Sequence, residues 1–376
     1  MAQPARTDRF DPRRDRRDPA SLDRRVSRFP DRRGHLTPDK REGPHKVTGK
    51  DARKGGPPGV EREAERGREA GRPGEIPKPG WRDIALRTWR EQSRDNLSLV
   101  AAGVAFYVLL AMVPAMAAML SIYGLVADPR QLQQNIGQMG GVLPQDAMSI
   151  IQRQLSEVAS GAGGALSVAA AVSILLALWS ASKGMKGLIQ ALNIAYEEEE
   201  RRGFLKLNAV SLGLTLAGLI FFIVALTAVV AIPAILGNLG LPDSVEWAVS
   251  LARWPLLAVA GIVALAALYR YAPSRDAPRW RWVSPGSVAA TLLWIAASLL
   301  FSVYVSNFGS YNETYGSLGA VVILLMWLFI TSYVVLLGAE LNSEMEHQTR
   351  KDTTKGEPRP MGSRGARMAD ELGPKP

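Results

Sequence analysis

Few side chains in the apolar part of this chain could do chemistry. The protein has no cysteine, and its three histidines, His35, His45 and His347, all lie in polar regions near the two ends. Thiol nucleophiles, thiolate metal sites and histidine-based clusters are therefore excluded from the apolar part. The carboxylates are dispersed over connecting segments, so no positioned base or metal-held water for phosphodiester hydrolysis is recognisable. We expect no enzyme activity, no catalytic residue, no metal site and no cofactor.

Three ionisable residues do stand close to apolar stretches. Glu340 lies near the end of the last stretch, Lys183 follows the second, and Arg270 follows the fourth. A carboxylate at such a depth faces protein, is paired or is protonated. These residues are therefore either structural ion pairs and snorkelled anchors or a relay for a proton or a substrate. Tyr107 and Asn193 are polar side chains of the kind that hydrogen-bonds between helices.

The segments that position these residues have the composition of a membrane protein. The whole chain has 45 Lys and Arg and 35 Asp and Glu residues, but residues 97–341 contain only 12 of each kind. About 20 apolar residues cross roughly 30 Å of hydrocarbon, and six stretches approach or exceed that length. The six predicted transmembrane helices are Leu97–Val126, Ala162–Ser182, Leu207–Leu236, Trp254–Tyr269, Val283–Val305 and Leu318–Leu337. The predicted fold class is all-α and polytopic, with Pro114 and Pro233 as kink points.

The basic residues of this membrane domain predict its orientation. Nine of the 12 lie in two connectors, at 183–206 and 270–281. Lys and Arg near the ends of spans stay preferentially on the cytoplasmic side. The two connectors are separated by two predicted spans, so every second loop is inside and both ends of the chain join these loops. We expect the N- and C-termini to be cytoplasmic.

The regions outside the spans divide into tails and amphipathic helices. Residues 1–80 and 343–376 are polar and nearly free of aliphatic runs, so we expect them to be disordered. Residues 81–96 alternate apolar residues and arginines at helical spacing, which predicts an amphipathic helix in the headgroup layer; a soluble docking helix is the alternative. Similar periodicity predicts that the second span continues to Tyr196 and that a short outer helix covers 147–158.

Several motifs distributed from about Trp81 to Asn342 resemble one known family. They are Asp95 with the alanine-rich run 101–107 and Pro114, residues 191–194, residues 268–270 with Pro273, the pair Pro285 and Gly286, and residues 315–320 leading through Trp327 to 338–342. In these motifs the membrane domain, 97–342, resembles the YihY/BrkB family of bacterial inner-membrane proteins. Some members of that family were once labelled ribonuclease BN. Phe106 and Ala111 depart from its usual tyrosine and serine.

The resemblance implies a multi-pass protein of the bacterial cytoplasmic (inner) membrane that is linked to envelope biogenesis or resistance. It suggests transport of lipids or ions, without an agreed biochemical activity. With the residues considered above, it defines a candidate polar set for transport or structure. That set is Tyr107, Pro114, Lys183, Asn193, Tyr269, Arg270, Tyr315, Gly316, Glu340 and Asn342.

Three functions stay open at this stage. The first is a transporter or translocator of lipids or ions, and the second is a membrane scaffold or assembly partner that moves nothing. The third is the ribonuclease of the old family label, which the missing catalytic groups argue against. Expected partners are membrane lipids, a lipid or ion substrate and further copies of the chain in a homo-oligomer. In residues 6–33 eleven arginines are interleaved with six aspartates, and no stacking platform is present, so we expect no specific nucleic acid.

Overall fold

Helices form almost all the regular structure in the computed structural model, which describes residues 65–126, 168–231, 242–307 and 317–375. These ranges contain no β-strand, only an isolated bridge between Pro278 and Thr354. The helices are η2 (Pro73–Glu75), α2 (Lys78–Arg94), α3 (Leu97–Val126), α6 (Val168–Ala195), α7 (Phe204–Leu226), the π-helical η3 (Thr227–Ala231), α9 (Asp243–Tyr271), α10 (Trp280–Asn307), α12 (Ser317–Glu346) and α13 (Arg367–Asp370). The predicted all-α class is confirmed.

Five helices in the described ranges are long and apolar enough to cross a membrane. Their apolar segments are Leu97–Met116, Phe204–Val229, Trp247–Tyr271, Trp280–Ser306 and Gly319–Glu346. The span predicted at Trp254–Tyr269 is longer in the structure because α9 continues through Arg253 to Asp243. The span predicted at Ala162–Ser182 begins outside the described residues, and α6 covers its later part. As predicted, the helix then continues, to Ala195.

The spanning helices pack as a series of neighbouring pairs. Helix α3 packs against α6 and α12, α12 packs along α10, and α10 packs against α9. Helix α7 packs on α6 but touches α9 only over a short stretch. Only 6% of the apolar segment is buried in α7 and in α9, against 22% in α3 and α12. Helices α7 and α9 are therefore the least constrained by protein contacts, and most of their apolar side chains are free to face lipid.

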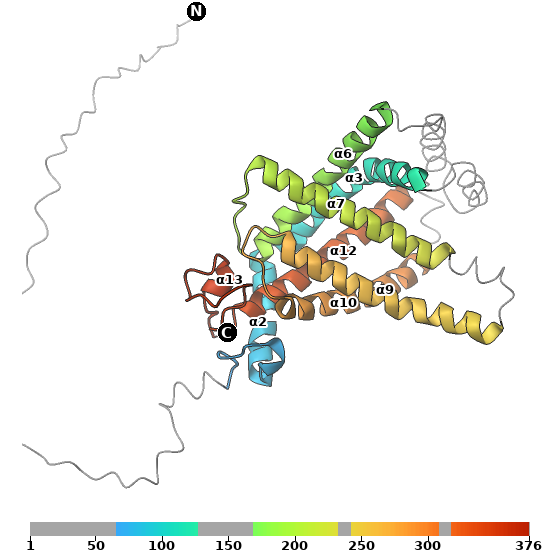
Figure 1. Ribbon diagram of the computed structural model, residues 1–376. Coiled ribbons are helices and arrows are strands. Elements are labelled where there is room, and N and C mark those ends of the chain that lie inside the picture. The colour runs from blue at the N-terminus through green and yellow to red at the C-terminus, as the bar shows by residue number, and fades with distance from the viewer. Residues whose placement is uncertain (1–64, 127–167, 232–241, 308–316, 376) are drawn as a thin grey trace, which may run out of the picture. The chain divides into compact units, whose positions relative to one another are not determined.

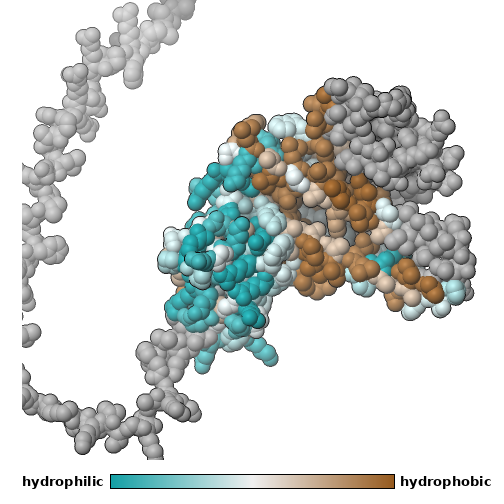
Figure 2. Space-filling model, in the orientation of Figure 1, coloured by the Kyte–Doolittle hydropathy of each residue, from teal (hydrophilic) through white to brown (hydrophobic). Residues whose placement is uncertain are grey.

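Buried apolar side chains gather where α3 begins and α6, α9 and α12 end. Leu97, Leu192, Tyr196, Tyr269 and Leu336 are all fully buried in this cluster. Polar surface surrounds the same region, whereas apolar surface covers the long helices (Figure 2). We call this region, with α2 and the C-terminal segment, the polar end (Figure 1).

Two parts of the predicted tails are folded, and the prediction of disorder is wrong for both. Residues 65–80 hold η2 and the start of α2, with Ala70 and Ile76 buried. Residues 343–375, within the predicted disordered tail 343–376, extend α12 and then fold across the polar end. Composition misled here because this segment is stabilised by polar contacts more than by apolar burial. Residues 1–64, the outer helix predicted at 147–158 and the kink point Pro233 lie outside the described residues.

Helix α2 confirms the predicted helix at 81–96, although it begins at Lys78 and ends at Arg94. Its buried face includes Ile84, which packs with Trp282 and Met345. Asn96 separates α2 from α3 with a φ of 50°, a left-handed conformation that asparagine tolerates better than most residues. Helix α2 therefore docks on protein along one face, and Trp89 remains 71% exposed on another.

Candidate functional site

Glu340 is a buried carboxylate on α12. It is 1% exposed, and its Oε2 atom has no hydrogen-bond partner in the described part of the chain. The charges that act on it most strongly are all acidic: Asp95, Glu344, Glu91 and Glu197. Within the described ranges, no three His, Asp or Glu side chains are arranged to hold a metal ion. Glu340 is thus a buried carboxylate among like charges and not part of a metal-ligand cluster.

The structure does not bring Lys183 and Arg270 to Glu340. Among the described residues no ion pair joins Glu340 to either of them, and Lys183 is exposed on α6. The Arg270 guanidinium donates from Nη1 to the carbonyl oxygen of Pro278 and lies 4.9 Å from the ring centroid of Trp280. Arg270 therefore stabilises the turn between α9 and α10.

Asn193 and Tyr269 link the ends of different helices. The Asn193 Oδ1 atom accepts a hydrogen bond of 2.8 Å from the backbone N–H of Ser274, and its Nδ2 atom donates to Glu200 at 3.2 Å. The buried Tyr269 hydroxyl donates to the carbonyl oxygen of Val335 at 2.8 Å. These bonds connect α6 to the α9–α10 turn and α9 to α12, so both side chains position the polar end.

Asn342 connects α12 to α10 at a close crossing. Its Oδ1 atom accepts from the backbone N–H of Gly286 at 2.8 Å, and its Nδ2 atom donates to the carbonyl oxygen of Val283 at 3.1 Å. A Cβ atom built on Gly286 would lie 2.2 Å from the carbonyl oxygen of Gly338. The two backbones meet here because both positions are glycine.

The other members of the predicted set do not join this group. Tyr107 is half exposed on α3 and packs against Gly187 of α6, since a Cβ atom at Gly187 would lie 3.2 Å from the tyrosine Cδ2 atom. Pro114 lies inside α3, which continues beyond it to Val126. Tyr315 and Gly316 lie outside the described residues. Asn193, Tyr269, Arg270, Glu340 and Asn342 are therefore the predicted residues that gather at the polar end.

Two buried ion pairs of the polar end were missed by the sequence prediction. Arg87 of α2 pairs with Glu344 of α12, and both side chains are at most 3% exposed. Arg275 pairs with Glu346 at 2.5 Å, with both side chains fully buried, and its guanidinium lies 4.4 Å from the ring centroid of Tyr196. The apolar residues Leu337, Leu341 and Met345 recur every four residues, which is a signal that α12 continues past the predicted span.

The C-terminal cap, residues 347–375, covers the connection between α9 and α10. Several hydrogen bonds attach it to the connections between helices. The Asp276 N–H donates to the Gly365 carbonyl at 2.9 Å, the Arg279 N–H to the Thr353 carbonyl at 2.9 Å, and the Lys355 N–H to the Ala277 carbonyl at 3.0 Å. The Arg367 N–H donates to Glu198 Oε1 at 2.7 Å. Within the cap, the buried Arg364 guanidinium donates to four backbone carbonyl groups. The cap thus joins the α6–α7 and α9–α10 connections.

Two carboxylates of the polar end, Asp95 before α3 and Glu200 between α6 and α7, lie in opposite electrostatic environments. Burial, followed by repulsion from Glu197 and Glu91, raises the pKa of Asp95 to about 6. Burial alone would raise the pKa of Glu200, but hydrogen bonds from Arg202 outweigh it and lower that pKa to about 2. Asp95 therefore changes charge close to physiological pH, whereas Glu200 stays ionised.

Asp95→Asn should make the protein more stable at pH 7.5 by about 1–2 kcal/mol and leave it nearly unchanged at pH 4. The folded pKa of Asp95 lies above its unfolded value, so ionisation opposes folding and stability is lost as the pH rises from about 4 to about 6. Thermal unfolding of the full chain in detergent between pH 4 and 8 measures this difference.

Asp352→Asn is the matched control, with the opposite sign. Burial alone would raise the pKa of Asp352, but hydrogen bonds from Arg359 and Thr354 lower it. The wild-type carboxylate therefore stabilises the fold above its unfolded pKa, and its loss should destabilise the variant at pH 7.5. Equal pH profiles for wild type and Asp95→Asn would contradict the assignment of Asp95.

Comparisons with known proteins cover most of this region. A family model described as virulence factor BrkB matches residues 88–362. The putative ribonuclease-like protein YfkH of Bacillus subtilis is 32% identical over 256 residues, which are 67% of this chain and 90% of the relative. The UPF0761 membrane protein PBPRA3489 of Photobacterium profundum is 27% identical over 284 residues, 73% of this chain and 85% of the relative. No solved structure matches the chain.

The family match begins at residue 88, after Trp81, but extends 20 residues beyond Asn342, where the sequence motifs end. It begins inside α2 and ends at residue 362, within the C-terminal cap. The shared region therefore includes the spanning helices, the Arg275–Glu346 pair and much of the cap. Of the other buried pair it includes Glu344 but not Arg87.

Proposed function

Because the chain belongs to the virulence factor BrkB family of membrane proteins, we propose that it translocates lipids or ions across the bacterial cytoplasmic membrane and thereby serves envelope biogenesis. The proposal places both termini in the cytoplasm. It includes membrane lipids and a lipid or ion substrate as partners, with assembly into a homo-oligomer. It includes no enzyme activity and no specific nucleic acid, although one relative carries a ribonuclease-like name.

The observation that carries this proposal is the environment of Glu340. Its carboxylate is 1% exposed on a spanning helix, has an oxygen without a described hydrogen-bond partner, and has acidic neighbours. A purely structural helix contact would be more stable with an uncharged side chain there, because a buried unpaired carboxylate is costly. Ionisable residues of this kind in transporters load and release protons or cations.

The sparse packing of α7 and α9 supports the same proposal. These two helices have little protein around their apolar segments, whereas α10 and α12 cross at Gly286 and Gly338 with their backbones in contact. A rigid pair next to loosely packed helices allows one part to move against another. The π-helical turns Thr227–Ala231 at the end of α7 add a local irregularity of the kind often found at functional positions.

The C-terminal cap favours a second candidate, a scaffold that moves nothing. The cap is folded and largely polar, and it forms a defined surface at the polar end (Figure 2). Such a surface is suited to docking another protein. The two candidates differ in one measurable property, since a scaffold supports no flux.

Glu340→Gln should reduce flux by at least about tenfold, because the variant keeps the shape of the side chain but loses its proton exchange. The full chain is reconstituted into liposomes. Lipid movement is followed by dithionite reduction of a fluorescent phospholipid, and ion movement by a pH-sensitive dye inside the vesicle. The control is Glu357→Gln, which changes an exposed carboxylate of the cap and should retain wild-type flux.

Two results would count against the proposal. Wild-type vesicles that move neither lipid nor ions faster than empty vesicles would favour the scaffold. Equal flux in wild type and Glu340→Gln would remove Glu340 from the translocation mechanism.

A further inference from the structure

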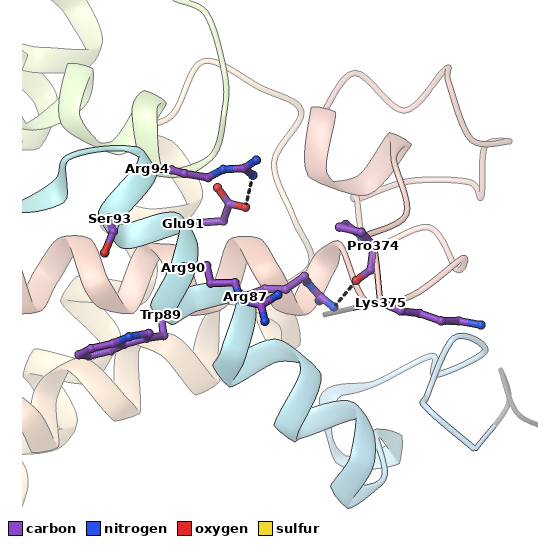
Figure 3. Close-up of a pocket in the computed structure, with 8 residues that line it drawn as sticks. All are labelled: Arg87, Trp89, Arg90, Glu91, Ser93, Arg94, Pro374 and Lys375. Carbon is purple, nitrogen blue, oxygen red and sulfur yellow. Dashed lines mark hydrogen bonds and ion pairs between the residues drawn. The ribbon is translucent and has the colours of Figure 1, made fainter.

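A basic pocket lies between α2 and the end of the C-terminal cap (Figure 3). Its volume is about 580 Å³. The residues that line it are Arg87, Trp89, Arg90, Glu91, Ser93, Arg94, Pro374 and Lys375. Four of these residues carry a positive charge and one carries a negative charge. The lining therefore has an excess of positive charge that suits an anion.

The arginines of the pocket differ in whether their charge is already paired with a carboxylate of the protein. Arg87 is buried and pairs with Glu344, and it also donates to the carbonyl oxygens of Glu344 at 3.0 Å and Pro374 at 3.5 Å. Arg94 pairs with Glu91 at 2.7 Å. No described residue forms a hydrogen bond or an ion pair with Arg90, which is exposed. Arg87 thus holds the cap against α2, and Arg90 is left to bind an incoming anion.

The pocket stands next to the start of a membrane span. Trp89 lies eight residues before Leu97, where the first apolar span begins. Its side chain is 71% exposed, and tryptophan is enriched where protein surface meets lipid headgroups. An anion from solution would gain nothing from this indole, whereas a lipid would cover its apolar ring.

We propose that this pocket binds the phosphate of an anionic phospholipid at the headgroup level of the membrane. Arg90 donates hydrogen bonds from its guanidinium to the phosphate oxygens, since the planar fork of arginine matches a phosphate better than a lysine ammonium does. Trp89 packs against the glycerol and upper acyl region of the same lipid. Arg87 is a positioning residue that keeps the cap in place behind the site. The binding does not depend on translocation.

Arg90→Gln should weaken binding of the first phosphatidylglycerol molecule by at least about tenfold, as expected for the loss of charged hydrogen bonds. The full chain in detergent is titrated with phosphatidylglycerol, and the first lipid adduct is measured by native mass spectrometry. Arg90→Lys should bind with intermediate affinity, because it keeps the charge but not the fork. Phosphatidylcholine should bind more weakly than phosphatidylglycerol to the wild type.

The matched control is Arg82→Gln. Arg82 is an exposed arginine on the same helix but is not part of the pocket lining, so its replacement changes the net charge equally. It should leave the first adduct unchanged. Similar losses in Arg82→Gln and Arg90→Gln would show a diffuse charge effect and overturn the proposal, as would equal binding of phosphatidylcholine and phosphatidylglycerol.

A competition experiment with soluble phosphates distinguishes binding of a lipid from binding of a free anion. Millimolar inorganic phosphate or glycerol phosphate should not displace phosphatidylglycerol from the wild type, because neither covers Trp89. Displacement by either compound would assign the pocket to a soluble phosphate and overturn the lipid proposal. Equal melting temperatures for wild type and Arg90→Gln are expected, and a lower value for the variant would assign Arg90 a structural role instead.

Discussion

Arg275→Ala should lower the free energy of unfolding by about 3–5 kcal/mol, the usual cost of breaking a buried ion pair by removing one partner. Arg275 and Glu346 are both fully buried and 2.5 Å apart, so the alanine variant leaves the Glu346 carboxylate without its cation. It also removes the guanidinium from the face of Tyr196. Thermal and chemical unfolding of the full chain in detergent measure the loss.

The control for this prediction is an exposed pair at the same end of the molecule. Lys351 lies 3.4 Å from Glu69, and both side chains are more than half exposed, so Lys351→Ala should cost less than about 1 kcal/mol. The double variant Arg275→Met, Glu346→Met should recover much of the loss, because no buried charge remains unpaired. If Arg275→Ala unfolded at the same temperature as Lys351→Ala, the pair would not be important for stability.

Gly286→Ala should also destabilise the protein strongly, by about 2–3 kcal/mol, because the methyl group cannot fit between α10 and α12. The added Cβ atom would lie 2.2 Å from the carbonyl oxygen of Gly338 and 2.4 Å from Asn342 Oδ1. Neither the backbone nor the bonded asparagine side chain can move away without loss of the helix crossing. The melting temperature in detergent and the yield of folded protein should both fall.

Gly213→Ala is the control for the glycine prediction. Gly213 lies in α7, and no heavy atom lies within 4 Å of a Cβ atom built there. Alanine favours a helix over glycine by about 0.5–1 kcal/mol, so this variant should be as stable as the wild type or more stable. A similar loss in both variants would show that the effect arises from the substitution type and not from the crossing.

The spanning helices could be predicted because their signal is long and simple. A run of about 20 residues without charge is rare outside membranes, and five of the six predicted stretches coincide with apolar helices. The ends were less predictable, since α9 continues past Arg253 and α12 continues through Glu344 and Glu346. Charged residues that are paired or exposed at a helix end do not stop the helix.

The C-terminal cap could not be predicted from composition. Its stability depends on specific hydrogen bonds, such as those from the Arg364 guanidinium to backbone carbonyls, and these leave no apolar periodicity. For the same reason, only part of the candidate site could be predicted. The sequence placed Glu340, Arg270 and Lys183 at similar depths, but it could not show that Arg270 turns towards Pro278 and that Lys183 faces outwards.

The contact between the segment before α2 and the segment after α12 has a topological consequence. Residues just before α2 touch residues just after α12: the Arg350 N–H donates to the Arg68 carbonyl at 2.8 Å, and Gln348 donates to the Arg66 carbonyl at 2.7 Å. Segments that touch must lie on one side of a bilayer, so the crossings between them must come in pairs. The five apolar helices alone would give an odd number of crossings. Helix α6 is the remaining long helix in the described ranges, and as a sixth crossing it makes the number even.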